Sequence, residues 1–565
     1  MKIRYRLYHS SILQPITLEY APEGWNDIKY TVARNFTYHG LFRSFSGALR
    51  FVKDGKEFID SILDEYGFEA EINIYIDELN TLTRIWENKI SGILNFDPEI
   101  YSKKENYTEV NFEDSVIHKK FKNRENNDVA YNRKRSINGT LLPGFASESH
   151  TVQLRGQNSD TCNATCIYPF EVFNRLIQII CDIDYNPLVS SVFGRTEYGY
   201  VENGKAAELM LTKGLLMRGF TLAGDELQAG ETNINFKLKE CFENYNKLFN
   251  LGLGTEYDTV NARWNFVIED KNYFYQTTEL FTLDLISNLE YSYEKELMIQ
   301  KITTGYRKFT DENDYGLSEY NNLSEFVTPI SVSDTELNLA SSYRADGSAF
   351  QIAIDNYYVL NEESQTDIDE DIFFVHAFDD SGTLKSVKNE NFDLIGGTYG
   401  LNPILANIYI SPARNLSRWG DYIKSSLGNF ETGNIRFNKS EKVSDLFSQY
   451  GAETSTLYEN RDIAISDLPA NRFSGRKIKF EAPLTRAQIN IITGNPYGLV
   501  KFWDYIDKVY NYGWIKEVST DRVDKDTTWE LWEVANLQEV ANNLLFMDGD
   551  EIFLMDGSTT IKTYA

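Results

Sequence analysis

Residues 55–77 have the sequence GKEFIDSILDEYGFEAEINIYID, in which a helix pattern passes directly into a strand pattern. The first half repeats apolar residues at helical spacing and stops at Gly67, which predicts an α-helix. The second half alternates apolar and polar residues, which predicts a half-buried β-strand. The apolar positions are Phe58, Ile59, Ile62, Leu63 and Tyr66 in the helix, and Phe68, Ala70, Ile72, Ile74 and Ile76 in the strand. This region therefore predicts a β-sheet accompanied by a helix.

Further strand and helix patterns follow along the chain. Residues 82–94 and 110–117 again favour strands, and residues 170–183 (FEVFNRLIQIICDI) predict a short helix. Residues 208–220 (ELMLTKGLLMRGF) indicate two strands joined by a glycine turn, as in a hairpin. The alternation of these patterns predicts an α+β fold that is mainly β.

A second strong helix is predicted over residues 235–250, with Asn235 or Thr232 as its N-cap. Its apolar face consists of Leu238, Cys241, Phe242, Tyr245, Leu248 and Phe249. Near the end of the chain, residues 544–558 (LLFMDGDEIFLMDGS) contain two Asp-Gly turns between apolar runs, which predicts a tight β-meander.

Composition narrows the classes of protein that fit. The 565 residues include 84 acidic and 56 basic side chains, for a net charge of −28. This charge excludes a protein that wraps nucleic acid with its whole surface, since such binding needs a basic footprint. Tyr, Phe and Trp number 36, 35 and 8, an aromatic excess that suits strands. At about 100–200 residues per domain, the length predicts three or four domains.

Cysteine usage and the N-terminal residues indicate the compartment. Four cysteines (Cys162, Cys166, Cys181 and Cys241) are too few for a disulfide scaffold and predict reduced thiols. Cys162 and Cys166 form a C-x3-C pair without a second pair at zinc spacing, so packing is the favoured interpretation. Residues 1–20 lack the pattern of a signal peptide, and no apolar run is long enough to span a bilayer.

One basic segment, residues 118–135, interrupts the acidic chain. Its basic side chains are Lys119, Lys120, Lys122, Arg124, Arg133, Lys134 and Arg135. We interpret it as a loop, which either faces phosphate or an acidic partner surface or is simply solvated.

No catalytic or metal-binding motif stands out. Asp367, Asp369 and Asp371 share the first spacings of a calcium loop, but Ile372 and Phe378 occupy the places of its glycine and bidentate glutamate. His39 in YHG is expected to be a packed or turn residue, and the scattered tryptophans are expected to lie in the core. We assign no catalytic, cofactor-binding or metal-binding residues, require no cofactor, and do not expect an enzyme.

Six stretches resemble tail-tip, baseplate and tail-hub proteins of tailed phages that infect Bacteroidetes-type bacteria. They cover residues 24–67 (GWNDIKYTVARNFTYHGLFRSFSGALRFVKDGKEFIDSILDEYG), 70–96 (AEINIYIDELNTLTRIWENKISGILNF), 108–126 (TEVNFEDSVIHKKFKNREN), 209–220 (LMLTKGLLMRGF), 235–257 (NFKLKECFENYNKLFNLGLGTEY) and 410–423 (ISPARNLSRWGDYI).

The resemblance implies a hub-like adaptor made of several β-barrel domains related to the tail-tube fold. Such a protein would form a ring or trimer with its own copies, contact neighbouring tail proteins and let DNA pass during ejection. It would be made in the host bacterial cytoplasm and reside in the virion. A substantial share of the acidic excess would then line the channel, where like charge keeps DNA from sticking. The alternative is a tail-tip protein that binds a receptor or degrades polysaccharide.

We expect four domains under this interpretation. These are a hub-like barrel with one helix (1–135), an inserted α+β domain (136–230), a second strand-rich hub-like domain opening with a helix (231–400) and a C-terminal strand-rich domain (401–565).

Overall fold

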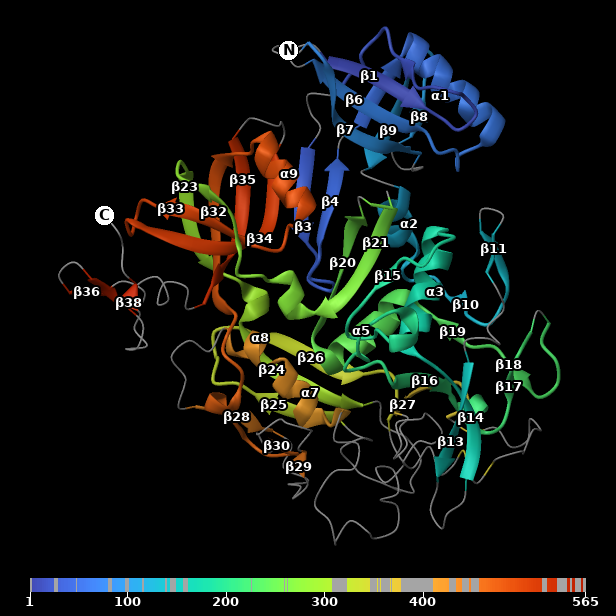
Figure 1. Ribbon diagram of the computed structural model, residues 1–565, viewed down its shortest axis with the longest axis vertical. Coiled ribbons are helices and arrows are strands. Elements are labelled where there is room, and N and C mark those ends of the chain that lie inside the picture. Colours follow the sequence, from blue (N-terminus) through green and yellow to red (C-terminus); the bar gives the residue numbers. More distant parts are fainter. Residues whose placement is uncertain are drawn as a thin grey trace.

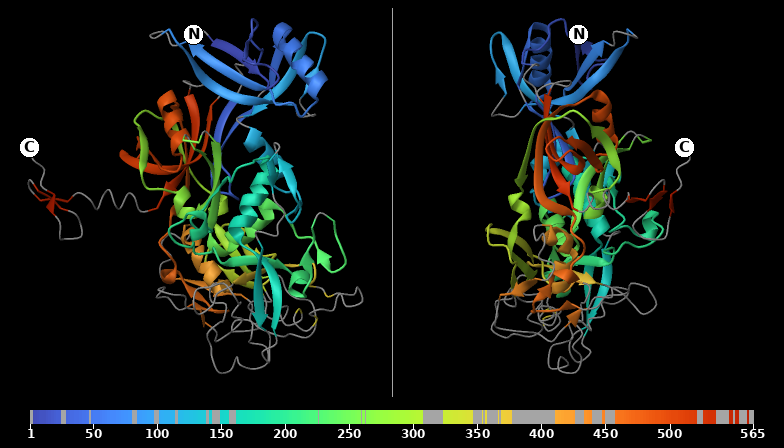
Figure 2. Two further views of the ribbon diagram at one scale, coloured as in Figure 1. Left: turned by 45° about the vertical axis from the view of Figure 1, so that its right-hand side comes forward. Right: turned by 90° about the vertical axis from the view of Figure 1, so that its left-hand side faces the viewer.

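The protein is described by a computed structural model (Figures 1 and 2). The described residues are 3–24, 29–46, 48–79, 84–96, 101–113, 116–137, 140–142, 149–155, 161–224, 226–258, 260–261, 263–306, 323–345, 353, 356, 366, 368–376, 410–425, 433–438, 447–448, 457–520, 526–535, 546–548, 551–553 and 560–561. Strands dominate and helices pack beside the sheets, which confirms the predicted α+β, mainly β class.

The N-terminal sheet lies at one end of the longest axis of the molecule and curls beside helix α1 (Lys53–Tyr66) (Figure 1). Its strand order is β2-β1-β6-β7-β9-β5, with β8 beside β9. The strands are β1 (Ile3–Tyr8), β2 (Ile16–Thr17), β5 (Ala48–Val52), β6 (Asn73–Leu79), β7 (Trp86–Asn95), β8 (Ser102–Lys103) and β9 (Tyr107–Glu113). The predicted helix is confirmed, and Gly67 ends it at a φ of 76°. The predicted strand begins at Asn73 rather than Phe68, because the chain turns after the helix and leaves Phe68 exposed.

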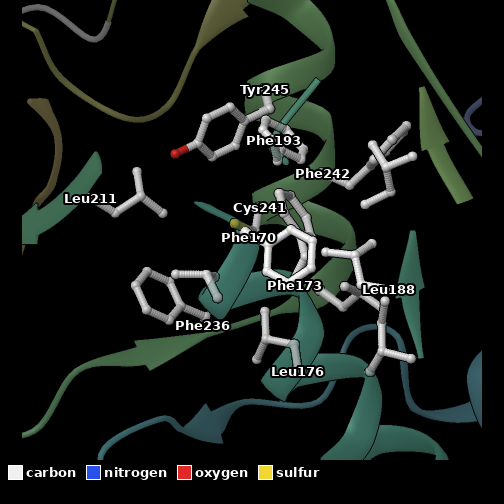
Figure 3. Packing of buried hydrophobic residues seen from close by; sticks show 14 of the residues in the cluster. Phe170, Phe173, Leu176, Leu188, Phe193, Leu211, Phe236, Cys241, Phe242 and Tyr245 are labelled. Carbon is white, nitrogen blue, oxygen red and sulfur yellow. The ribbon is translucent and has the colours of Figure 1, made fainter. Parts of the chain in front are cut away.

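Two buried helices organise the middle of the molecule. Helices α3 (Pro169–Cys181) and α5 (Leu238–Phe249) pack together through aromatic and aliphatic side chains, as Figure 3 shows. Both helices were predicted from periodicity. The N-cap of α5 is Lys237, not Asn235 or Thr232, because Asn235 pairs with Ala130 as part of a short strand. Asn250 ends the helix in the left-handed conformation.

Three small sheets surround these helices. The first has the order β13-β14-β16-β27, the second β15-β21-β20, and the third pairs β10 with β19. Their strands are β10 (Val129–Ala130), β13 (Ser149–Arg155), β14 (Thr161–Ile167), β15 (Leu188–Val189), β16 (Leu209–Lys213), β19 (Asn235–Phe236), β20 (Leu251–Asp258), β21 (Arg263–Asp270) and β27 (Ile372–His376). Two further ribbons pair β11 (Arg135–Ile137) with β12 (Thr140–Leu142), and β17 (Thr221–Leu222) with β18 (Glu231–Thr232).

The predicted hairpin at residues 208–220 is wrong. Strand β16 pairs with β14 and β27, and the chain then enters the short helix α4 (Gly214–Met217). A Cβ on Gly214 would lie 1.9 Å from the carbonyl oxygen of Ile368, so glycine permits this close backbone approach. The glycine therefore serves packing between distant segments rather than a local turn.

The largest sheet joins two strands from the N-terminal part of the chain to strands from its middle and its C-terminal part. Its order is β22-β33-β34-β35-β32-β23, and β3 pairs with both β34 and β4. The strands are β3 (Lys29–Arg34), β4 (Leu41–Ser46), β22 (Glu279–Leu283), β23 (Ser287–Tyr293), β32 (Phe473–Pro483), β33 (Leu499–Asp504), β34 (Val509–Thr520) and β35 (Asp526–Val534). Because β3 and β4 belong to this sheet, residues 29–46 fold together with strands from residues 279–293 and 473–534. The four-domain division stays a prediction.

The remaining elements lie around this sheet and at the other end of the molecule. A five-stranded sheet has the order β26-β24-β25-β28-β31, and helices α7 and α8 pack beside it (Figure 1). The bounds are β24 (Ile299–Tyr306), β25 (Leu323–Val327), β26 (Thr335–Ser341), β28 (Asn434–Phe437), β31 (Ile463–Ala464), α7 (Pro412–Arg418), α8 (Gly420–Lys424), α9 (Arg486–Gly494), β29 (Phe447–Ser448) and β30 (Leu457–Tyr458).

The C-terminal meander is confirmed, since β36 (Phe546–Asp548), β37 (Glu551–Phe553) and β38 (Thr560–Ile561) form an antiparallel three-stranded sheet. In the part of the chain that the structure describes, no helix is both long enough and apolar enough to cross a membrane.

Candidate interaction sites

The basic segment is partly helical. Helix α2 (Val116–Arg124) carries Lys119, Lys120, Lys122 and Arg124, so the predicted loop is wrong over these residues. The helix forms because Phe121 packs in the core, where its ring lies 5.5 Å from that of Tyr38. This tertiary contact overrides a sequence with little helical periodicity.

Two basic side chains of α2 neutralise carboxylates of the same chain. Lys120 pairs with Asp182 at 3.1 Å and Glu71 at 3.2 Å, and Arg124 pairs with Asp182 at 2.8 Å. Burial opposes ionisation of Asp182, but hydrogen bonds from Arg124 and Lys120 prevail and hold its pKa below the ordinary value. Lys119 and Lys122 form no ion pair with any described residue. Only part of the basic segment is therefore available to a partner.

Lys119 and Lys122 border a groove of about 920 Å³, which we call the α2 groove. Its lining also includes the aromatic side chains of Phe68, Phe96 and Tyr101. Phe68 is 66% exposed and its ring lies 5.6 Å from that of Tyr101. The groove thus combines aromatic side chains with acids and with two ammonium groups that form no ion pair with described residues.

The acidic residues with calcium-like spacing pair with buried arginines instead. Asp369 lies 2.5 Å from Arg218, and Asp371 lies 3.0 Å from Arg344. All four side chains are at least 90% buried. Asp367 lies outside the described residues. Among the residues that are described, no cluster of three or more His, Cys, Asp or Glu side chains could hold a metal ion.

The cysteines and His39 belong to the core. Cys166, Cys181 and Cys241 are buried free thiols, whereas the side chain of Cys162 lies outside the described set. His39 is buried and its Nδ1 lies 2.7 Å from the hydroxyl of Tyr275, which confirms that it is a packed residue. Burial, reinforced by nearby Lys271 and two arginines, lowers its pKa well below the ordinary value.

Tryptophans also pack inside. Trp419, Trp514, Trp529 and Trp532 are buried, and none of the tryptophans in the described ranges is exposed. Trp86, Trp264 and Trp503 are half-buried, so the expected core role is confirmed for the four buried tryptophans.

A cavity of about 810 Å³, which sequence patterns did not indicate, lies beside the largest sheet. Lys271 is in its lining, is 2% exposed, and has no hydrogen-bond partner for its Nζ among the described residues. The Nζ lies 3.8 Å from the ring centre of Trp419. Burial lowers the pKa of Lys271 well below its usual range. Arg472 and Asp421 form an ion pair at 2.6 Å in the same lining.

Exposed apolar side chains gather at the end of the β33–β34 hairpin, which we call the knob. Its members and exposed fractions are Leu285 (84%), Tyr505 (46%), Ile506 (57%), Val509 (38%) and Tyr510 (39%). The Leu289 amide donates to the Tyr505 hydroxyl at 3.0 Å, and the Tyr510 hydroxyl donates to Asp284 at 3.0 Å. These bonds tie the hairpin end to strand β23 and to the loop between β22 and β23.

Buried Asp504 fixes the turn of the knob. Its Oδ1 accepts from the amides of Ile506 at 2.7 Å and Asp507 at 3.0 Å. Its Oδ2 accepts from Asn511 at 3.0 Å and from the Tyr291 hydroxyl. Lys508 adopts a positive φ of 58° in the same turn. The hairpin end is therefore a rigid turn that presents apolar side chains outward.

Comparison with known proteins gave no match to a protein-family model and no match to a curated protein. Among solved structures, the chain is similar to the 43 kDa tail protein of prophage MuSo2 from Shewanella oneidensis, with 10% identity, 94% and 96% of the two chains covered, and a TM-score of 0.34. It is similar to a tail protein from Neisseria meningitidis MC58 with 8% identity, coverage of 94% and 97%, and a TM-score of 0.35. A prophage tail protein from Listeria monocytogenes EGD-e gives 7% identity, coverage of 94% and 94%, and a TM-score of 0.34.

Proposed function

We propose that this chain is a structural protein of a phage tail, a hub or baseplate adaptor in the ring or channel that joins the tail tube to the tail tip. The knob carries the proposal. A rigid, exposed apolar surface of this kind is typical of a protein–protein contact, because a soluble monomer gains nothing from displaying it. The sequence resemblance to tail-hub and tail-tip proteins indicates that this contact belongs to a phage tail.

The pairing of charged side chains within the chain supports a role in assembly. Asp369 and Asp371, two of the three acids with calcium-like spacing, and half of the basic groups on α2 are used in ion pairs within the chain. Side chains held in such pairs are less available to bind a ligand or a metal ion. The surfaces left over are an apolar knob and an aromatic groove, which suit contacts between proteins.

The acidic excess fits the same role. A net charge of −28 on each copy would give a ring a strongly negative surface. We propose that a substantial share of these carboxylates lines the channel, where they would repel the phosphates of passing DNA.

Mass measurement tests the proposal. The purified chain is measured alone and after mixing with the tail-tube protein and the tail-tip proteins of its virion. The proposal predicts a defined complex that contains several copies of the chain with these proteins. A chain that stays monomeric, does not bind the tail proteins and binds or cleaves a bacterial polysaccharide would favour the alternative, a tail-tip protein that binds a receptor or degrades polysaccharide.

A further inference from the structure

The knob is built for binding at low entropic cost. Asp504 is buried and accepts four hydrogen bonds, two of them from backbone amides of the turn. Tyr505 and Tyr510 are each held by a hydrogen bond of the hydroxyl group. A surface that is already ordered loses little conformational freedom when it docks. Ile506, at the centre of this turn, is therefore the natural anchor of a contact.

The α2 groove has the complementary chemistry. Its wall of Phe68, Phe96 and Tyr101 can cover apolar side chains, and its volume of about 920 Å³ leaves room for more than one. The charges also match. Asp284 and Asp507 accompany the knob as exposed acids, while Lys119 and Lys122 border the groove.

Each surface also carries charges of the sign opposite to its excess. Lys508 is an exposed cation of the knob. The groove lining holds the acids Glu69, Glu71 and Glu113 against the four basic side chains Lys119, Lys120, Lys122 and Arg124. Each surface thus carries both signs, with the excess acidic on the knob and basic on the groove. Opposite excess charge favours the encounter and sets the register of two surfaces.

The two surfaces lie apart on the molecule. In Figure 1, β33 lies on the left and α2 on the right, with other strands and helices between them. A knob cannot reach the groove of its own chain across this distance, whereas a second copy presents a free groove.

We propose that the knob of one copy docks in the α2 groove of the next copy. This contact rests on the proposed function, since it supplies the link between copies in a tail ring. It is heterologous: one copy gives the knob and the other gives the groove. Repetition of such a contact closes a ring when the rotation between copies permits it.

Complementation between two disabled chains tests the contact. Ile506→Asp disables the knob, and Lys119→Glu with Lys122→Glu disables the groove. Lys120 and Arg124 stay intact, because they stabilise the fold through Asp182. Val332→Asp, at another exposed apolar residue (79% exposed), is the matched control. Self-association of each full-length chain is measured by sedimentation velocity over a concentration series.

We expect the wild-type chain and Val332→Asp to associate alike, and each disabled chain to associate at least about tenfold more weakly. An equal mixture of the two disabled chains should form dimers that do not grow, since one chain still has a knob and the other a groove. When the wild-type chain associates in solution, a mixture of the disabled chains that stays monomeric, or disabled chains that associate like wild type, would overturn the proposal.

Cross-linking in assembled particles covers the case in which the ring forms only on the tail. One chain carries Ile506→Cys and another carries Lys122→Cys, and both are assembled together and oxidised. A disulfide between copies supports the contact. Particles that contain the chain but yield no cross-link overturn this contact and leave the tail role standing, whereas particles that lack the chain overturn the tail role itself.

Discussion

Replacing Arg218 by Met should destabilise the region around β16 and β27 strongly. The Arg218 and Asp369 side chains are only 1% and 7% exposed, and their charged atoms lie 2.5 Å apart. Removing one member of a buried pair leaves the other charge without compensation, at a cost of about 3–5 kcal/mol. Thr366 also donates to Asp369 at 2.8 Å, which offsets part of the loss and favours the lower end of this range.

Amide hydrogen exchange measures this loss of free energy of local unfolding at strands β16 and β27. A loss of about 3–5 kcal/mol corresponds to a fall of roughly two to four orders of magnitude in protection, for amides that exchange through local unfolding. The amides to follow are those of β16 and β27, which are paired from Leu209 to Lys213. Lys295→Met is the matched control, because its ion pair with Asp334 is largely exposed and should not matter.

Two results would refute this reasoning. Arg218→Met could leave protection at the level of the Lys295→Met control, which would mean that the buried pair contributes nothing. Alternatively, calcium or a chelator could change protection in the wild-type chain, which would mean that the acids near residue 369 hold a metal ion rather than arginine.

Three further changes test other parts of the structure. Burial lowers the pKa of His39 below its ordinary 6.5, so the stability that depends on its neutral form is present above pH 6.5 and is lost as the pH falls below it. In His39→Asn, the asparagine tolerates the positive φ of 60° at this position and does not titrate, so the unfolding midpoints at pH 7 and pH 5 should differ less than in the wild type. An unchanged difference would contradict this. Lys271→Met should raise the free energy of unfolding, measured with denaturant, by about 1–2 kcal/mol. The reason is that the desolvation cost of a buried amine with no hydrogen-bond partner among the described residues exceeds its attraction to Trp419. A loss of stability would show that the amine has a partner. Gly214→Ala should lower stability by about 1–3 kcal/mol, because the added methyl collides with the Ile368 carbonyl, and a neutral effect would contradict the close approach.

Local patterns were sufficient for the elements whose own residues decide their structure. Helices α1 and α5 each bury one apolar face, and α3 is buried on nearly all sides; the apolar residues of all three indicated helices in advance. The C-terminal meander followed from two Asp-Gly turns. Such elements carry their own signal because burial of one face repeats with the period of the helix or strand.

Other features depend on partners far along the chain. Helix α2 forms around Phe121, and the only local hint was Ile117 four residues before it. The 208–220 segment looked like a hairpin because its glycine suits a turn, whereas that glycine contacts Ile368. The pairing of Arg218 with Asp369 spans 151 residues. Sequence alone gives no means of choosing these partners, so the ion pairs, the cavity at Lys271 and the α2 groove emerged only from the structure.

Reconstruction of the virion by electron cryomicroscopy tests the central claim most directly. The account predicts several copies of this chain in a ring where the tail tube meets the tip, with the knob of each copy in the α2 groove of the next and an acidic channel wall. A chain found only on peripheral fibres or absent from the particle, or a neutral or basic channel wall, would contradict it.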